Sequence, residues 1–205
     1  MAPAYWNEAK RALARRDAVL AGIIRSHPGI ALSTRGDAFQ TLARSIVGQQ
    51  ISVKAAESVW GRFAGAIEAV EPRAVLRAGK RGLARSGLSK RKVEYLLDLA
   101  RHFADGSIDV RAWESLDDEA VIRTLVEVRG IGRWTAQMFL IFNLMRPDVL
   151  PLEDLGLQRA VRRHYAGGDD LSVAALREIA QTWVPWRSVA TWYLWRSLDP
   201  VPVEY

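Results

Sequence analysis

The chain has 205 residues, of which 49% are hydrophobic and 25% charged, a balance typical of a folded protein with one or two domains. Its 29 Lys and Arg outnumber 23 Asp and Glu, and the net charge of +6 favours a polyanionic partner such as nucleic acid. The absence of cysteine excludes disulfides, thiol nucleophiles and cysteine-ligated metals, and the absence of a long apolar run or secretion signal argues against a membrane or exported protein.

Hydrophobic residues recur at helical spacing along nearly the whole chain, and no segment alternates as a strand would. The repeat at i, i+3, i+4, i+7 and i+8 is clearest in Phe39, Leu42, Ala43, Ile46 and Val47. In chain order, we expect helices over about 4–26, 37–48, 53–64, 71–78, 90–104, 117–128, 133–144, 155–165, 173–182 and 187–198. The expected N-cap residues are Ser52, Ser89, Asp117, Asp154 and Ser172. The sequence therefore predicts an all-α protein.

Short breaks, and no low-complexity linker, separate these helices. We expect residues 1–205 to form a single unit with two lobes. Residues 36–125 would form a central lobe, and residues 126–205 would form the second lobe together with residues 1–35. A cleft between two lobes is a common place for an active site, and we expect the site there.

The segment Val128-Arg129-Gly130-Ile131-Gly132 predicts a tight turn between two helices. Gly130 and Gly132 would permit unusual dihedral angles and a close approach of the backbone to a phosphate. The next helix, beginning near Arg133, would direct its free N–H groups and positive dipole end at the same anion. Such contacts position DNA without reading its sequence, although an isolated GxG turn is only a weak motif.

The longer string LVEVRGIGRWTAQMF, residues 125–139, resembles the helix-hairpin-helix of the DNA glycosylase superfamily that includes endonuclease III. The resemblance extends over about 36–198 and implies a two-lobed helical fold with the active site between the lobes. It implies DNA contacts from the hairpin at Gly130, Gly132, Arg133 and Thr135. It also implies a sodium or potassium ion held by the backbone carbonyls of Val126, Val128 and Ile131, with no required cofactor.

A single acid follows the hairpin in the string PLEDLGLQRAV, residues 151–161. Asp154 precedes a helix, where a cap stabilises by about 1 kcal/mol, and capping is compatible with catalysis. Breaking an N-glycosidic bond builds positive charge on the sugar, which a desolvated carboxylate can stabilise while it orients the attacking water. The superfamily has its catalytic aspartate at this position, so we expect Asp154, and not Glu153, to be catalytic.

Superfamily members that also cleave the backbone use a lysine that forms a Schiff base with the sugar. In this chain the matching position, two residues after Gly132, is Trp134. Lys80 and Lys92 are expected in the other lobe. The sequence therefore predicts a monofunctional glycosylase without lyase activity.

Four of the eight tryptophans fall in the string WVPWRSVATWYLW, residues 183–195. The W-x-P-W-R-S pattern resembles the C-terminal helix of the 3-methyladenine DNA glycosylase II branch, and it places the base-stacking tryptophan at Trp195. Trp134 matches an aromatic residue of the same base pocket, but Met138 departs from the branch, which has an aromatic there. Stacking on tryptophan favours cationic bases by about 0.5–2 kcal/mol, which indicates alkylated purines such as 3-methyladenine.

Base flipping requires a side chain that fills the gap left in the duplex. The loop Gly48 to Ser52 resembles the family's wedge, with Gln50 as the first choice and Ile51 and Gln49 beside it. A basic segment could follow a phosphate strand, although a solvated face is the simpler interpretation. It comprises Lys80, Arg81, Arg85, Lys90, Arg91 and Lys92.

The combined hypothesis is a hydrolase of base excision repair that acts on alkylation damage in double-stranded DNA. We expect a monomer in the cytoplasm, associated with the nucleoid, and a short form without the N-terminal β domain of larger relatives. Two alternatives stay open: a non-catalytic helix-hairpin-helix DNA-binding module, and a glycosylase for oxidised or deaminated bases. No role is assigned to His27, His102 or His164, which lie far apart in the sequence.

Overall fold

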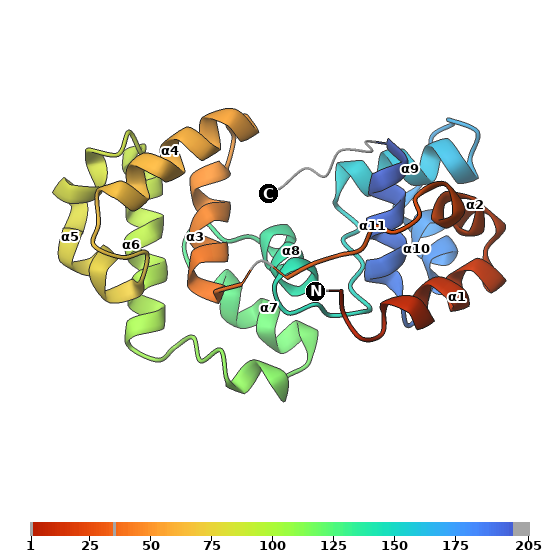
Figure 1. Cartoon of the computed structure of the whole chain (residues 1–205), viewed down its shortest axis with the longest axis horizontal. Coiled ribbons are helices and arrows are strands. Elements are labelled where there is room, and N and C mark those ends of the chain that lie inside the picture. Colours follow the sequence, from red (N-terminus) through yellow and green to blue (C-terminus); the bar gives the residue numbers. More distant parts are fainter. Residues whose placement is uncertain (1, 35, 199–205) are drawn as a thin grey trace. The chain divides into compact units, whose positions relative to one another are not determined.

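A computed structural model describes residues 2–34 and 36–198. Within these ranges the chain forms eleven α-helices and one short 3-10 helix and contains no β-strand (Figure 1). The all-α prediction is confirmed. None of the described helices combines the length and the apolar character needed to cross a membrane. The predicted ranges also included residues 1, 35 and 199–205, which lie outside the described part.

The helices follow one another with short connections. Their bounds are α1 Trp6–Arg16, α2 Ala18–Ser26, α3 Ala38–Gly48, α4 Val53–Gly65, α5 Pro72–Ala84, α6 Lys90–Ala104, η1 Ala112–Glu114, α7 Asp118–Val126, α8 Arg133–Phe142, α9 Leu155–Tyr165, α10 Val173–Gln181 and α11 Arg187–Leu198.

All five predicted N-caps are confirmed. Each side chain accepts a hydrogen bond from the backbone N–H three residues later, which satisfies a donor that the first helical turn leaves unpaired. The capping residues are Ser52, Ser89, Asp117, Asp154 and Ser172.

The predicted helix over 4–26 is wrong, because the chain forms two helices that meet at Asp17. Asp17 has an extended backbone, with φ −139° and ψ 111°, and its Oδ1 accepts the N–H of Leu20 as the cap of α2. Its Oδ2 accepts the Tyr165 hydroxyl at 2.6 Å and the Trp183 indole N–H at 3.0 Å. The two hydrogen bonds from distant residues favour a break between α1 and α2 at Asp17. The spacing of hydrophobic residues in 4–26 does not reveal this break, because it reports only on neighbouring positions.

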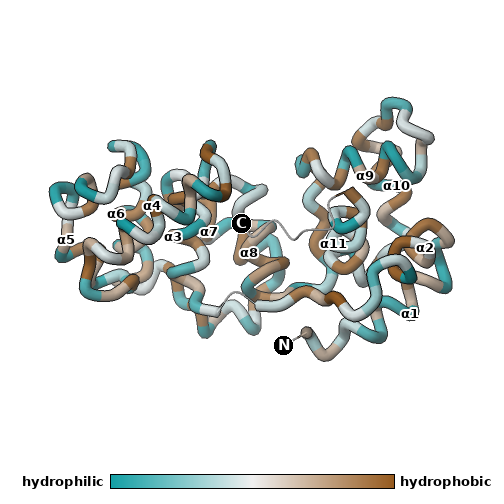
Figure 2. Tube along the Cα trace, turned by 45° about the horizontal axis from the view of Figure 1, so that its top comes forward, coloured by the Kyte–Doolittle hydropathy of each residue, from teal (hydrophilic) through white to brown (hydrophobic). Residues whose placement is uncertain are grey.

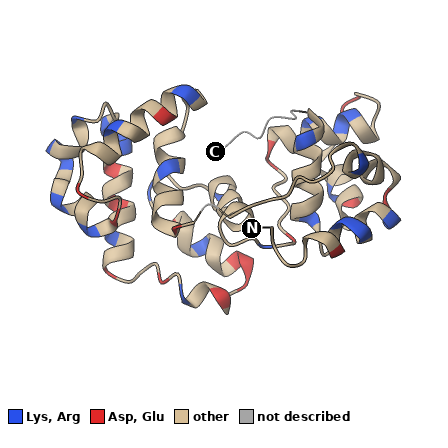
Figure 3. Ribbon diagram, viewed as in Figure 1, with Lys and Arg blue, Asp and Glu red and all other residues tan. Residues whose placement is uncertain are grey.

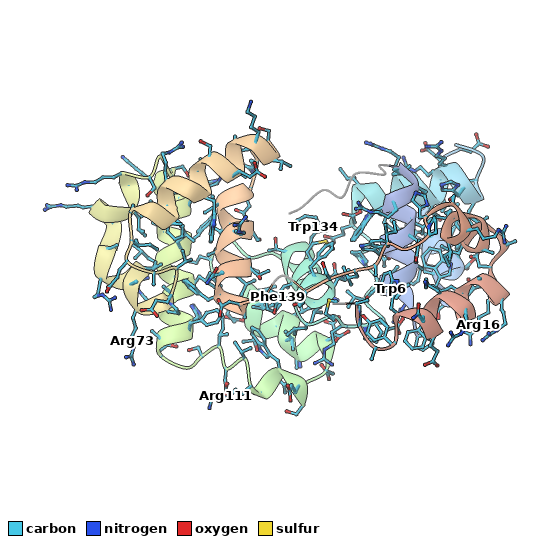
Figure 4. All side chains as sticks on the ribbon, in the orientation of Figure 1. Trp6, Arg16, Arg73, Arg111, Trp134 and Phe139 are labelled. Carbon is cyan, nitrogen blue, oxygen red and sulfur yellow. The ribbon has the colours of Figure 1, made fainter. Side chains whose placement is uncertain are left out.

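Contacts between Cα atoms divide the chain into two units, and one of them contains residues 2–34 and 140–198. Helix α11 packs against α1, α2 and α9, and eight of its twelve residues are buried, as expected of a central helix. Trp6, labelled in Figure 4, contributes from α1 by packing edge-on to Trp192, 5.2 Å between centroids, and stacking on Tyr193 at 5.7 Å.

The other unit contains residues 36–139, in which α3 packs on α4 and α6, and α6 also packs on α5. In Figure 2, hydrophobic and hydrophilic stretches alternate along the helices, consistent with the amphipathic pattern of the sequence. We predicted that the central lobe would end near residue 125, but this unit continues to Phe139. The hairpin that follows α7 belongs to it because Gln49 and Asp98 both hydrogen-bond to the hairpin backbone.

Candidate functional site

The carboxylate of Asp154 is held by two hydrogen bonds at the start of α9. Its Oδ1 accepts the backbone N–H of Leu157 at 2.6 Å and the indole N–H of Trp195 at 2.8 Å. Only 9% of Asp154 is exposed, whereas the neighbouring Glu153 is exposed to solvent. The first bond is the helix cap, and the second bond joins two residues that the sequence analysis had selected separately.

The indole ring of Trp195 is held by a hydrogen bond at its edge and by stacking on its face. Besides the bond from its indole nitrogen to Asp154, its ring stacks on Phe142, with centroids 5.8 Å apart and planes inclined by 14°. The side chain remains partly exposed. The sequence analysis did not select Phe142, because helical periodicity alone assigns it to the core.

Gly156 lies against this pair, and it too was missed. A Cβ atom at this position would lie 3.1 Å from Asp154 Oδ1, and 3.1 and 3.2 Å from Cδ1 and Nε1 of Trp195. These distances are shorter than ordinary van der Waals contacts, so any side chain at Gly156 must displace the carboxylate or the indole. A glycine two residues after a capping aspartate is the only sequence feature that hints at this role.

We expect the substitution Gly156→Ala to lower the rate of any chemistry performed by Asp154 by about tenfold, because displacements of tenths of an ångström already misalign a reacting group. Single-turnover rates at saturating substrate would measure the effect. Gly22→Ala is the matched control in the same unit, because a Cβ at Gly22 meets nothing within 4 Å. Equal rates for Gly156→Ala and the wild-type protein would contradict this packing role.

Arg187 and Ser188 of the W-x-P-W-R-S string hold the segment that leads to Asp154. Arg187 forms a two-pronged ion pair with Asp148, with Nε and one terminal nitrogen 2.7 and 2.8 Å from its two carboxylate oxygens. The Ser188 hydroxyl donates to the Arg146 carbonyl at 2.6 Å and accepts the Val149 N–H at 2.9 Å. The string therefore anchors the connection between α8 and α9 to the helix that bears Trp195.

In the other unit, the hairpin depends on Gly130. Gly130 has φ +91°, and a Cβ there would lie 2.1 Å from Cδ2 of Tyr95 on α6. Gly132 has no positive φ, and a Cβ there would meet nothing within 4 Å, so our expectation that both glycines need unusual dihedral angles is wrong for Gly132. Val128 and Ile131 are buried and anchor the turn in the core, and Val126 is exposed.

The loop between α3 and α4 presents Gln50 in a strained conformation. Gln50 is exposed and has φ +59°, a region that costs a non-glycine residue about 1–3 kcal/mol and is enriched at functional sites. Ile51 beside it is 40% exposed. The Gln49 side chain has a different role, because its Nε2 donates to the Gly130 carbonyl at 2.8 Å.

Lys92 does not belong with the residues proposed to follow a phosphate strand. Its Nζ donates to the carbonyls of Val47 and Gln49, at 2.7 Å each, and partial burial lowers its pKa. The other basic residues of that segment, Lys80, Arg81, Arg85, Lys90 and Arg91, are exposed. Figure 3 shows Lys and Arg positions distributed along the ribbon of α4 to α6.

Helix α8 carries the remaining selected residues. Trp134, labelled in Figure 4, is partly exposed, and Met138 and Thr135 are buried. Trp134 and Met138 are four residues apart, so they share one face of the helix. Arg133 forms an ion pair with Glu119, whose pKa is lowered chiefly by the hydrogen bond from this guanidinium.

Residues 43–185 match a protein family described as "HhH-GPD superfamily base excision DNA repair protein". The chain belongs to this superfamily. The DNA-3-methyladenine glycosylase of Saccharomyces cerevisiae is 33% identical to it over 80% of this chain and 68% of the relative. A crystal structure described as a DNA-3-methyladenine glycosidase from Bacillus halodurans is 34% identical and superimposes with a TM-score of 0.86, covering 93% of this chain and 89% of that one.

A second solved HhH-GPD relative is Schizosaccharomyces pombe 3-methyladenine DNA glycosylase in complex with abasic DNA. It is 25% identical and superimposes with a TM-score of 0.80. The match covers 97% of this chain and 98% of the relative. Some curated relatives are longer. The chain spans 66% of the Bacillus subtilis protein YfjP, to which it is 30% identical.

Proposed function

We propose that this protein is a monofunctional DNA glycosylase that hydrolyses the N-glycosidic bond of alkylated, cationic purines such as 3-methyladenine in double-stranded DNA. The observation that carries the proposal is the buried Asp154 carboxylate, held in one orientation by the Leu157 amide and the Trp195 indole. The names of the relatives, several of which are 3-methyladenine glycosylases, support the substrate class.

In the proposed reaction, the damaged nucleotide is flipped out of the duplex, and the bond between its base and its sugar breaks. The departing base takes the bonding electrons, and positive charge develops on the sugar. The Asp154 carboxylate stabilises that charge, orients the water that adds to the sugar carbon and accepts the proton that this water loses. Because only a small fraction of Asp154 is exposed, the charge interaction is screened less than in bulk water.

A cationic base suits a site that offers no evident general acid. Alkylation of a ring nitrogen already makes the base a good leaving group, so protonation of the base is not required. The partly exposed ring of Trp195, braced by Phe142, is the proposed stacking surface. Trp134 and Met138 belong to the other unit, and their role in binding the base is proposed from the sequence resemblance alone. Stacking of a cation on tryptophan adds about 0.5–2 kcal/mol.

The same residues account for a hydrolase without lyase activity. By the sequence resemblance, Trp134 occupies the position of the lysine that backbone-cleaving members of the superfamily use, so no amine is available there to form a Schiff base. The Lys92 ammonium group is committed to two backbone carbonyls. The proposed product is therefore an intact strand with an abasic site.

DNA would be held by backbone groups of the hairpin around Gly130 and Gly132 and at the start of α8. For Thr135, whose side chain is buried, only the backbone amide is proposed to take part. The backbone carbonyls of Val126, Val128 and Ile131 are the proposed ligands of a sodium or potassium ion. We further propose that the protein acts as a monomer in the cytoplasm, at the nucleoid.

Release of bases from a set of duplexes, each with one lesion, tests the substrate class. Single-turnover rates should be higher for the cationic bases 3-methyladenine, 7-methylguanine and 1-methyladenine than for neutral hypoxanthine and 8-oxoguanine, because neutral bases are poorer leaving groups. Preferential release of 8-oxoguanine or hypoxanthine would favour the alternative of an oxidised-base or deaminated-base glycosylase. No release of any base would favour a non-catalytic DNA-binding module.

A further inference from the structure

One helix, α6, is bonded both to the hairpin that is proposed to hold DNA and to the α3–α4 loop, which the sequence predicts to fill the gap left by a flipped base. On the side of the α3–α4 loop, Lys92 Nζ donates to the carbonyls of Val47 and Gln49, each at 2.7 Å. Gln49 continues the connection, because its side-chain Nε2 donates to the Gly130 carbonyl at 2.8 Å. These bonds join residues 43 to 81 positions apart in the sequence.

The hairpin also rests directly on the following turns of α6. The backbone N–H of Arg129 donates to Asp98 Oδ2 at 2.9 Å, and its guanidinium pairs with Glu94 at 3.2 Å. The ring of Tyr95 lies where a Cβ of Gly130 would be. The first half of α6 therefore contacts the α3–α4 loop through Lys92 and the hairpin through Glu94, Tyr95 and Asp98.

Elementary electrostatics explains why a lysine occupies this place. The last carbonyls of α3 have no partner within the helix and lie at the negative end of its dipole, where a cation is stabilising. Both lysine bonds are to backbone atoms, so they fix the path of the chain on either side of Gly48. Gln50 then follows in its strained conformation, with φ +59°, which persists only where neighbouring structure holds it.

We propose that Lys92 and Gln49 are positioning residues that fix the Gln50 loop to the hairpin. Helix α6 thereby sets, before DNA binds, the distance between Gln50, which would enter the duplex, and the hairpin, which would bind the phosphate. The inference rests on the proposed function. Because the loop is ordered before DNA binds, less conformational freedom is lost when a base is flipped. The benefit should be largest for a lesion that is paired and stacked.

Two variants test this inference. Lys92→Met removes both lysine bonds and keeps a long side chain, and Gln49→Met removes only the bond to Gly130. Amide hydrogen exchange in the free protein should become faster at residues 48–52 and 128–132 in both variants. The control Lys90→Met replaces an exposed lysine of the same helix, and it should leave exchange at these two segments unchanged.

Base release supplies the second measurement. On a duplex with the lesion opposite its normal partner, both variants should be slower than wild type by about tenfold, since a loosened wedge loop no longer compensates for unstacking. On a duplex with the lesion opposite an abasic site, where no base pair has to be broken, the loss should stay within about threefold.

Unchanged exchange at both segments, or an equal loss of rate on the two duplexes, would overturn the inference. If Lys92→Met does not fold, Gln49→Met decides, because it removes a single hydrogen bond. If the wild-type protein releases no base from either duplex, the proposed function fails, and the exchange data still show whether these residues fix the loop.

Discussion

The substitution Asp154→Asn is expected to slow base release by about 100- to 1,000-fold, the usual effect of removing one electrostatic group from a transition state. Asparagine retains a carbonyl oxygen that can accept the bonds from Leu157 and Trp195. It is also as good an N-cap as aspartate, so the free energy of unfolding should not change. The substitution therefore removes the charge and little else.

Two measurements make this result specific. DNA affinity of Asp154→Asn should equal that of the wild type, because the hairpin and the α3–α4 loop are unaltered. Glu153→Gln is the matched control, since this exposed neighbour carries the same charge and should retain full activity. Normal base release by Asp154→Asn, or a comparable loss in Glu153→Gln, would show that Asp154 is not the catalytic carboxylate.

The substitution Gly130→Ala is expected to reduce the free energy of unfolding by about 2–4 kcal/mol, because overpacking and a positive φ act together. The new Cβ would lie 2.1 Å from Tyr95 Cδ2, so the ring or the hairpin backbone must move. DNA affinity should fall by about tenfold or more, because the N–H groups that grip the phosphate lose their alignment. Denaturant unfolding and DNA titration would measure the two effects.

Gly132→Ala provides the comparison, because a Cβ at Gly132 has open space and no positive φ to oppose it. Its free energy of unfolding should remain within about 0.5 kcal/mol of the wild type. Tyr95→Ala should relieve most of the destabilisation caused by Gly130→Ala, and a double-mutant cycle would measure this coupling. Equal destabilisation by the two glycine substitutions would contradict the steric explanation.

Local features of the sequence predicted most of the fold. The helices at 90–104, 155–165 and 187–198 have the bounds expected from hydrophobic period and caps, because both depend on residues a few positions apart. The break at Asp17 was missed because it depends on Tyr165 and Trp183, which are 148 and 166 positions away in the sequence. The continuation of the hairpin's unit to Phe139 was missed for the same reason.

In the candidate site, too, local motifs identified some residues, and contacts between distant residues were missed. Asp154, Trp195 and the hairpin glycines were selected from motifs, but the bond between Asp154 and Trp195 is a contact across 41 positions that no motif specifies. Gly156 and Phe142 have no chemistry of their own and are significant only through what they touch. Lys92 was grouped with solvent-facing basic residues because charge alone does not reveal its two backbone partners.

The most direct measurement of the central claim is a single-turnover reaction of the wild-type protein with a duplex that contains one 7-methylguanine. The products would be analysed before and after hot alkali, with a parallel reaction in borohydride. The account predicts free 7-methylguanine, a strand that breaks only after alkali, and no protein covalently attached to DNA. An absence of free base, a strand broken without alkali, or a covalent adduct trapped by borohydride would contradict it.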